Sequence, residues 1–329
     1  MDAQPPVDVW FLLLPGSLIL DWAGPAEALR IANAQLAQRG KPPRYRLRFI
    51  GPQAQPASSV GVPIAGVEPL PAALPAPSWL VLVGQPGDRL DLQTPAARAA
   101  LAWLARLRPD SATLRIVTIC AGAVLAGQAG LLRGRRATTH HQHLEELRAC
   151  GAGCEVVGNR VFVIDGPLAS SAGITTGIDL ALHLIAQDCG PALAAEVAQT
   201  MVVALRRGPQ DPELSPFIAW RHHIHPVLHR VQDAVGAEPQ APWTVPRMAE
   251  VGHTSARHLT RLFITHAGIA PLQYLQRIRL AVAQAALGAG RSVTQAAELA
   301  GFSSDTQLRR AWHRHHLAGT PSRVALLQN

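Results

Sequence analysis

The segment MAEVGHTSARHLTRLF, residues 248–263, has a second copy in AAELAGFSSDTQLRRAW, residues 296–312. Aligning Gly252 with Gly301, an offset of 49 residues, superposes the pattern G-x-x-S-x-x-x-L-x-R-x-[FW] in both copies. Glycine permits a tight turn between two helices, serine caps the second helix, and leucine with an aromatic residue at i+4 docks that helix on its neighbour. The repeat therefore predicts two helix-turn-helix units, with first helices at residues 245–251 and 294–300 and second helices at about 255–266 and 304–315.

The residues between the two copies predict a long helix that ends near residue 288. Four apolar residues recur there at helical spacing and fall on one face: Leu275, Ile278, Val282 and Ala285. Such a helix would connect the two units rigidly.

The front of the chain alternates short β-rich apolar runs with helix-like stretches, which is typical of an α/β sheet covered by helices on both faces. The expected strands are residues 9–14, 46–50, 79–83 and 114–119, and the expected helices are 25–38, 95–107 and 175–186. Residues 155–164 predict a hairpin that turns at Gly158-Asn159. The segment RRGPQDPELSP, residues 206–216, has three prolines and mixed charge, so we expect a linker there. The predicted domains are thus an α/β domain at 1–205 and an all-α domain at 217–329.

The composition indicates a globular protein with an ample core, because the chain has 329 residues, of which 48% are hydrophobic and 16% charged. The longest apolar run, residues 9–20, is interrupted by Pro15 and Gly16 and is too short to span a membrane. The first residues lack a signal-peptide pattern, so we expect a cytoplasmic protein. The cysteines lack paired metal-ligand spacing and are expected to be reduced thiols: Cys120, Cys150, Cys154 and Cys189.

Positive charge is concentrated at the C-terminal end. Residues 1–242 hold 20 basic and 19 acidic side chains, whereas residues 243–329 hold 10 and 3. The net charge of +8 is therefore +1 in the first part and +7 in the second. Arginines that neutralise phosphates release condensed counterions, so a basic module of this kind favours a polyanionic partner. On charge alone, a solvated basic face is the alternative.

The repeat, with its connector GIAPLQYLQRIRLAVAQAAL and its closing Thr320-Pro321, resembles the AraC-type DNA-binding domain over about residues 243–324. The resemblance implies double-stranded promoter DNA as a partner. The chain departs from the family pattern at HRHHLAGTP, residues 313–321, which has one extra residue and Ala318 at the usual glycine.

In a helix-turn-helix, the early residues of the second helix enter the major groove. The residues expected at the DNA are Ser255, Ala256, Arg257, Thr260 and Arg261 in the first unit, and Ser304, Asp305, Thr306, Arg309 and Arg310 in the second. Arg257 and Thr306 should face the bases. Arg261 and Arg310 occupy equivalent positions in the repeat and should flank the DNA backbone or brace the helix.

Four stretches of the front part resemble the PfpI-like branch of the class I glutamine-amidotransferase-like superfamily, over about residues 7–205: LDWAGPAEALRIAN, VTICAGAVLAGQAGLL, GRRATTHH and SSAGITTGIDLALHLI. Together with the C-terminal module, this order resembles the GlxA-type transcriptional regulators. The resemblance implies a flavodoxin-like sandwich that senses a small metabolite. Relatives suggest nitrogen-containing ligands, such as amino-acid or quaternary-ammonium compounds.

Cys120 follows a predicted strand and precedes a helix, and the positive field of a helix N-terminus lowers the pKa of a thiol placed there. The resemblance implies a pocket around this thiol, with Asp21 as its carboxylate, the Ala121 amide and the Gly84 loop as oxyanion donors, and His140 nearby. Peptidase-like members carry histidine directly after this cysteine, and isonitrile-hydratase relatives carry threonine. Here that residue is Ala121, so we expect no enzyme and no catalytic residue.

Two other functions stay open. The first is a cysteine-dependent hydrolase or hydratase that uses Cys120 and Asp21 and has a fused DNA-binding module. The second is a redox sensor that uses the Cys120 thiol. Weak metal hints at Cys150 and Cys154, and at His222, His223 and His225, are interpreted as bystander thiols and a solvated helix start. We expect no cofactor, no metal and no membrane partner, and a homodimer, because sensor domains of this superfamily commonly pair through their α/β faces.

Overall fold

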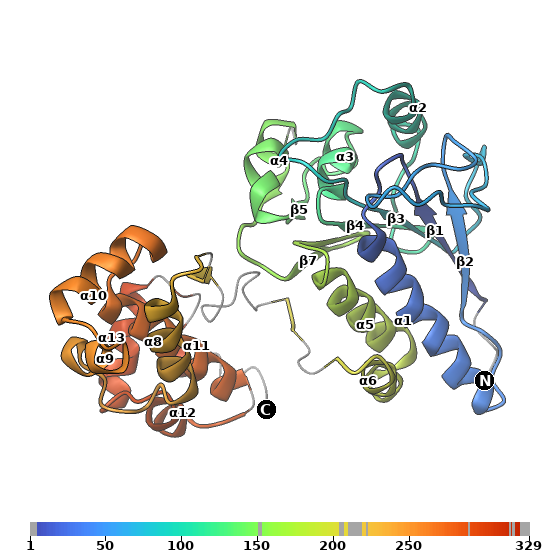
Figure 1. Cartoon of the computed structure of the whole chain (residues 1–329). Helices are drawn as coiled ribbons and strands as arrows, with labels where there is room; N and C mark the ends of the chain where they lie inside the picture. Colours follow the sequence, from blue (N-terminus) through green and yellow to red (C-terminus); the bar gives the residue numbers. More distant parts are fainter. Residues whose placement is uncertain are drawn as a thin grey trace. The chain divides into compact units, whose positions relative to one another are not determined.

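The computed structural model describes residues 5–150, 153–203, 207–209, 219–221, 223–288, 290–315, 317 and 320–322 (Figure 1). The chain divides into two compact units, Met1–Glu213 and Leu214–Asn329. The predicted linker at residues 206–216 lies mostly outside the described residues, so its bounds stay a prediction. Within the described residues, no helix is long and apolar enough to cross a membrane.

The N-terminal unit is built on a six-stranded sheet with the order β2-β1-β3-β4-β8-β7. Its strands are β1 (Val7–Leu12), β2 (Tyr45–Ile50), β3 (Ser78–Leu82), β4 (Leu114–Ile119), β7 (Phe162–Asp165) and β8 (Leu168–Ser171). All neighbours pair in parallel except β7 with β8. Because Leu12 pairs with Leu82 and Leu82 with Thr118, the carboxyl ends of three central strands meet at one edge.

Helices cover both faces of this sheet, as the apolar runs predict (Figure 1). One face carries α1 (Ile19–Gln38), α5 (Thr176–Cys189) and α6 (Pro191–Thr200), and the other carries α2 (Pro95–Leu104), α3 (Gly122–Gln128) and α4 (Leu144–Cys150). Successive β1 residues alternate between the two cores: Val9 and Phe11 enter the first, and Trp10 and Leu12 enter the second. The prediction of a flavodoxin-like α/β sandwich is confirmed.

The hairpin predicted at residues 155–164 is wrong. Instead, β6 (Glu155–Val156) pairs in parallel with β5 (Arg136–Ala137), and the hairpin joins β7 to β8 through Gly166, whose φ is 57°. The sequence did not predict β8, because Ser170 and Ser171 are polar. The segment is a strand because it pairs with β4 on one side and with β7 on the other.

The helix predicted at residues 25–38 begins earlier, at Ile19, and contains Pro25. Proline has no N–H to donate to the carbonyl of Asp21, four residues before it, and is therefore more common at the start of a helix than inside one. For this reason the sequence indicates Pro25 as the first residue of the helix. The earlier start places Asp21 in the first turn of α1.

The C-terminal unit is helical. Its elements are α8 (Pro226–Ala237), α9 (Val245–Val251), α10 (Ala256–Leu262), a π-helical turn η2 (Phe263–Ala267), α11 (Pro271–Gly288), α12 (Val293–Leu299) and α13 (Asp305–Arg314). The pairs α9–α10 and α12–α13 are the two predicted helix-turn-helix units. Each has its own core, in which the repeated leucine and aromatic residue are buried: Leu259 with Phe263, and Leu308 with Trp312.

The long helix α11 serves both cores, but not only through the single face predicted for it. Leu275 and Ile278 enter the first core and Val282 packs against the second, as expected, whereas Ala285 is exposed. The second core also takes Leu280 and Ala283, which at about 100° per residue lie on a different side of the helix from Leu275 and Ile278. The second unit therefore also packs on a side of α11 that the predicted face does not include.

The shared glycine of the repeat has a different role in each unit. Gly301 has φ +77°, and a Cβ there would lie 2.5 Å from the Cα of Gln240. Gly252 has φ −75°, and the left-handed turn residue is His253, with φ 51°. A tight turn is thus present in both units, but glycine is its left-handed residue only in the second.

Candidate functional site

Cys120 lies at the sharp turn between β4 and α3. Its φ is +54°, which is unusual for a residue with a side chain, and its thiol is buried at 4% exposure. The Thr139 hydroxyl donates to the Cys120 carbonyl at 2.8 Å, and the Cys120 amide donates to the Ser171 carbonyl at 3.1 Å. The predicted strand-to-helix elbow is therefore present and braced from two neighbouring segments.

The structure brings Asp21, Gly84, Cys120 and Ala121 together at the carboxyl edge of the sheet. A Cβ on Gly84 would lie 2.9 Å from Asp21 Oδ2, 3.0 Å from the Ala121 nitrogen and 3.1 Å from Cys120 Cβ. The Gly84 amide donates to Asp21 Oδ2 at 2.8 Å. The Gly84 amide itself therefore already pairs with the Asp21 carboxylate, and the expected role of the Gly84 loop as an oxyanion donor stays a prediction.

Asp21 is fully buried, and only one of its carboxylate oxygens is satisfied. Among the described residues, Oδ1 has no hydrogen-bond partner. Desolvation raises the pKa of this carboxyl from 3.8 to about 7, although the hydrogen bond from Gly84 opposes the shift. At neutral pH, Asp21 is therefore divided between its charged and neutral forms.

His140 lies beside the elbow segment and is half-buried. Gly173 lies against the His140 ring, because a Cβ on Gly173 would be 3.4 Å from His140 Cδ2. Desolvation, and then the proximity of His141 and His143, lowers the pKa of His140 to about 4. Its imidazole is thus neutral at pH 7 and is a weak base.

The other sequence hints at metal sites find no support in the described part of the chain, where no group of three His, Cys, Asp or Glu side chains could hold an ion. Cys150 and Cys154 pack against the second core of the sandwich, and burial raises the pKa of both thiols. His222 lies outside the described residues.

The predicted serine caps are present in both helix-turn-helix units. Ser255 accepts from the His258 amide, and Ser304 accepts from the Gln307 amide, each at 3.2 Å. These bonds satisfy free N–H groups in the first turns of α10 and α13.

In α10, Arg257 is exposed, and no ion pair or hydrogen bond to its side chain occurs among the described residues. Arg261 is also exposed, but its guanidinium contacts His258 Nδ1 at 2.9 Å. The Thr260 hydroxyl donates to the Ala256 carbonyl at 2.9 Å. Arg257 is therefore the side chain of this helix with the greatest freedom to reach a partner.

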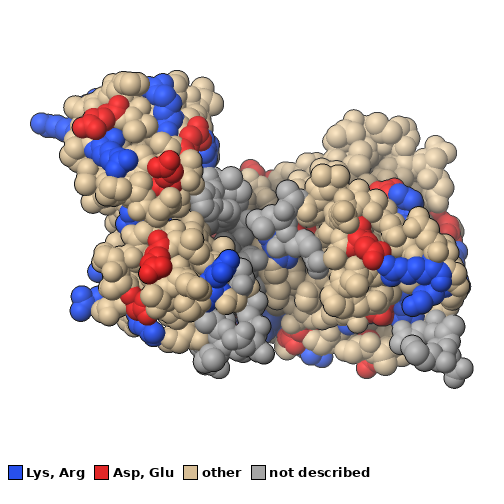
Figure 2. All heavy atoms as spheres, turned by 90° about the horizontal axis from the view of Figure 1, so that it is seen from below, with Lys and Arg blue, Asp and Glu red and all other residues tan. Residues whose placement is uncertain are grey.

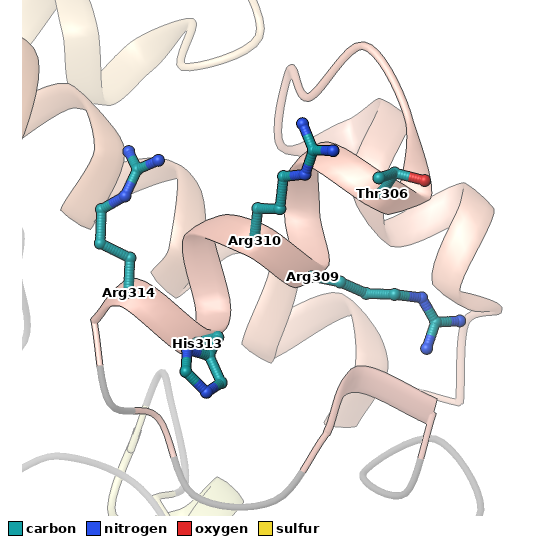
Figure 3. Close-up of a pocket in the computed structure, with 5 residues that line it drawn as sticks. All are labelled: Thr306, Arg309, Arg310, His313 and Arg314. Atoms are coloured by element: carbon teal, nitrogen blue, oxygen red, sulfur yellow. The ribbon is translucent and has the colours of Figure 1, made fainter.

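In α13, the exposed side chains line a shallow depression of about 530 Å³: Thr306, Arg309, Arg310, His313 and Arg314 (Figure 3). His313 and Arg314 are absent from the predicted set. They follow Arg309 and Arg310 by four residues, so helical spacing carried this signal. The predicted contact residues came only from the early part of the helix, which ends before His313 and Arg314.

Charge by itself does not outline an interface on the face drawn in Figure 2, where basic and acidic side chains are interspersed on both units. The exposed helix faces, rather than the net charge, define the candidate contact surface.

Comparison with known proteins supports both units. Residues 248–325 match a helix-turn-helix domain family, and residues 81–187 match the DJ-1/PfpI family. The HTH-type transcriptional regulator CdhR of Pseudomonas aeruginosa is 32% identical over 96% of this chain and 90% of its own length. The chain belongs to the GlxA-type family of transcriptional regulators.

Two further similarities are narrower than the family match. Isonitrile hydratase of Pseudomonas putida is 40% identical over 32% of this regulator and 44% of the hydratase. A crystal structure of an AraC family transcriptional regulator from Pseudomonas putida aligns over its whole chain with 60% of this one, at 20% identity and a TM-score of 0.51. That likeness shows the fold alone. As an AraC-type helix-turn-helix regulator, the protein binds DNA and regulates transcription.

Proposed function

We propose that this regulator senses a small nitrogen-containing metabolite at the elbow of its PfpI-like domain and transmits binding to its DNA-binding domain. The observation that carries the proposal is Asp21, a buried carboxyl with one oxygen bound by the Gly84 amide and the other without a hydrogen-bond partner in the described part of the chain. Leaving a buried acceptor unsatisfied is costly, whereas an N–H or cationic nitrogen of a ligand would pair with it.

The pocket must open to admit a ligand, because Asp21, Gly84, Cys120 and Ala121 are all buried. A ligand that binds only the open form would shift the population toward that form. Such a shift would couple the effector to a change of shape in the domain.

The test is a thermal-shift screen of amines, amino acids and quaternary ammonium compounds on wild type, Asp21→Asn and Asp8→Asn. Asp8 is the matched control because it is a nearly buried carboxylate at the amino end of β1, where it pairs with Arg46. We expect a ligand to raise the Tm of wild type and Asp8→Asn but not of Asp21→Asn. Equal stabilisation of all three proteins would remove Asp21 from the pocket.

We further propose that α10 and α13 contact promoter DNA in two successive major grooves. The pool of contact residues is Ser255, Arg257, Thr260 and Arg261 with Ser304, Thr306, Arg309 and Arg310. The exposure of the four arginines in this pool supports the assignment. Genome-wide binding of the tagged regulator would identify its operators.

An enzyme is the second candidate, favoured by the strained elbow at Cys120 and by the partial likeness to isonitrile hydratase. Against it, Ala121 provides no proton-transfer group, and the low pKa of His140 makes this histidine a poor base. Steady turnover of a metabolite that is lost in Cys120→Ala would favour the enzyme. Fast, reversible peroxide oxidation that alters DNA binding would favour the redox sensor instead.

A further inference from the structure

Arginine side chains predominate on the exposed face of α13. Leu308, Ala311 and Trp312 hold the opposite side of this helix in the core. Among the described residues, no carboxylate pairs with Arg309, Arg310 or Arg314. Asp305, four residues before Arg309, instead accepts a hydrogen bond from the Thr294 hydroxyl at 3.2 Å.

The basic side chains of α13 fall into two pairs with a spacing of four residues, Arg310 with Arg314 and Arg309 with His313, so each pair starts from one side of the helix. Arg310 and Arg314 extend to one side of the helix, whereas Arg309 and His313 extend to other sides, with Thr306 near the N-terminal end (Figure 3). A helix in the major groove has a phosphate backbone on each side of it. Two pairs of basic side chains on different sides of one helix fit this arrangement.

Resting on the proposed placement of α13 in a groove, we propose that this face is a two-sided phosphate clamp. Arg310 and Arg314 contact the backbone of one strand, and Arg309 with His313 contacts the other. The clamp supplies sequence-independent affinity, while Thr306 lies over the bases. This adds His313 and Arg314 to the interface and assigns Arg310 to the backbone.

The first unit differs from the second in this respect. Its helix α10 carries two exposed arginines, and Arg261 is already engaged by His258. The second unit therefore provides the larger share of phosphate neutralisation, and Arg257 of the first unit is left to discriminate between bases.

The test measures the affinity of the full chain for a labelled mixed-sequence duplex of about 30 base pairs, enough for two adjacent grooves and their flanks. Each phosphate contact contributes about −0.9 to the slope of log K against log salt concentration. We expect Arg309→Ala/Arg314→Ala to reduce the slope by about two. The corresponding double lysine variant should keep the wild-type slope, because lysine retains the charge.

Arg98→Ala is the matched control, since it removes an exposed arginine from α2 of the other unit and should leave the slope unchanged. A wild-type slope in the folded double alanine variant would overturn the clamp. An equal loss in the lysine variant would also overturn it, as would equal affinity for single-stranded DNA of the same length. By contrast, a wild-type protein without salt-dependent duplex binding would refute the proposed function itself.

Discussion

Asp21 combines a fully buried carboxyl with a pKa of about 7, so its ionisation couples stability to pH near neutrality. The folded protein holds this proton up to about pH 7, whereas the unfolded chain releases it near 3.8. The contribution to stability is therefore complete below pH 3.8 and is lost as pH rises toward 7. In that window, we expect the free energy of unfolding to fall by about 1.4 kcal/mol per pH unit from this group.

Asp21→Asn should remove that fall, because its amide stays neutral. Denaturant titrations at several pH values should show the variant more stable than wild type by about 2–4 kcal/mol at pH 8, with the difference shrinking toward pH 5. Asp8→Asn should gain no such stability, because Asp8 loses its ion pair with Arg46. Parallel pH profiles for wild type and Asp21→Asn would contradict the assignment.

Arg257 is the residue for which we expect a change in sequence preference. An arginine that is bidentate to guanine provides about 1–3 kcal/mol of discrimination. Arg257→Ala should therefore relax preference at one half-site, whereas Arg310→Ala should weaken binding to all sequences alike. Selection of bound duplexes from a random pool would measure both effects. An Arg257→Ala protein that selects the wild-type motif would show that this arginine does not contact bases.

At the scale of the elements, the two turn glycines offer a direct comparison. Gly301→Ala forces a Cβ into a left-handed residue and against the Gln240 backbone, so we expect a loss of about 2 kcal/mol or more. A Cβ at Gly252 meets the Val227 and Val231 side chains at 3.1 and 3.2 Å and the Ala249 carbonyl at an ordinary 3.5 Å, and the φ of Gly252 is ordinary. Gly252→Ala should cost less, about 1 kcal/mol. Chemical denaturation compares the two, and equal losses would show that the backbone contact at Gln240 is relieved.

At the scale of the whole molecule, the rigid helix α11 joins both recognition helices. We expect footprinting on an operator to show two protected major grooves about 10 base pairs apart on one face of the duplex. Protection of a single groove would mean that one unit does not engage. The segment HRHHLAGTP, part of which lies outside the described residues, makes the second unit the one to examine.

Assembly is the second prediction at this scale. The N-terminal unit has its own two-layered core, so we expect a chain truncated after Leu205 to fold and to form a homodimer. Analytical ultracentrifugation at micromolar concentration would test this. A monomeric truncated protein beside a dimeric full chain would place the dimer interface in the C-terminal unit.

Elements whose signals are local could be predicted from the order of the amino acids alone. The repeat around Ser255 and Ser304 specified both helix-turn-helix units and their caps, because capping and i+4 packing act over one or two turns. The apolar run of β1, like the other short apolar runs between helical stretches, indicated a sheet covered on both faces. The elbow at Cys120 was visible as a strand that runs directly into a helix.

Only the tertiary structure decided the features that depend on which elements become neighbours. Asp21 and Gly84 meet Cys120 because strand order brings three carboxyl ends together, and burial there, rather than residue type, raises the pKa of Asp21. Strand β8 likewise depends on its neighbours, because its polar serines are part of a strand only where they pair with β4 and β7. The use of α11 by two separate cores follows equally from tertiary packing, because no pattern within the helix says which unit covers which of its residues.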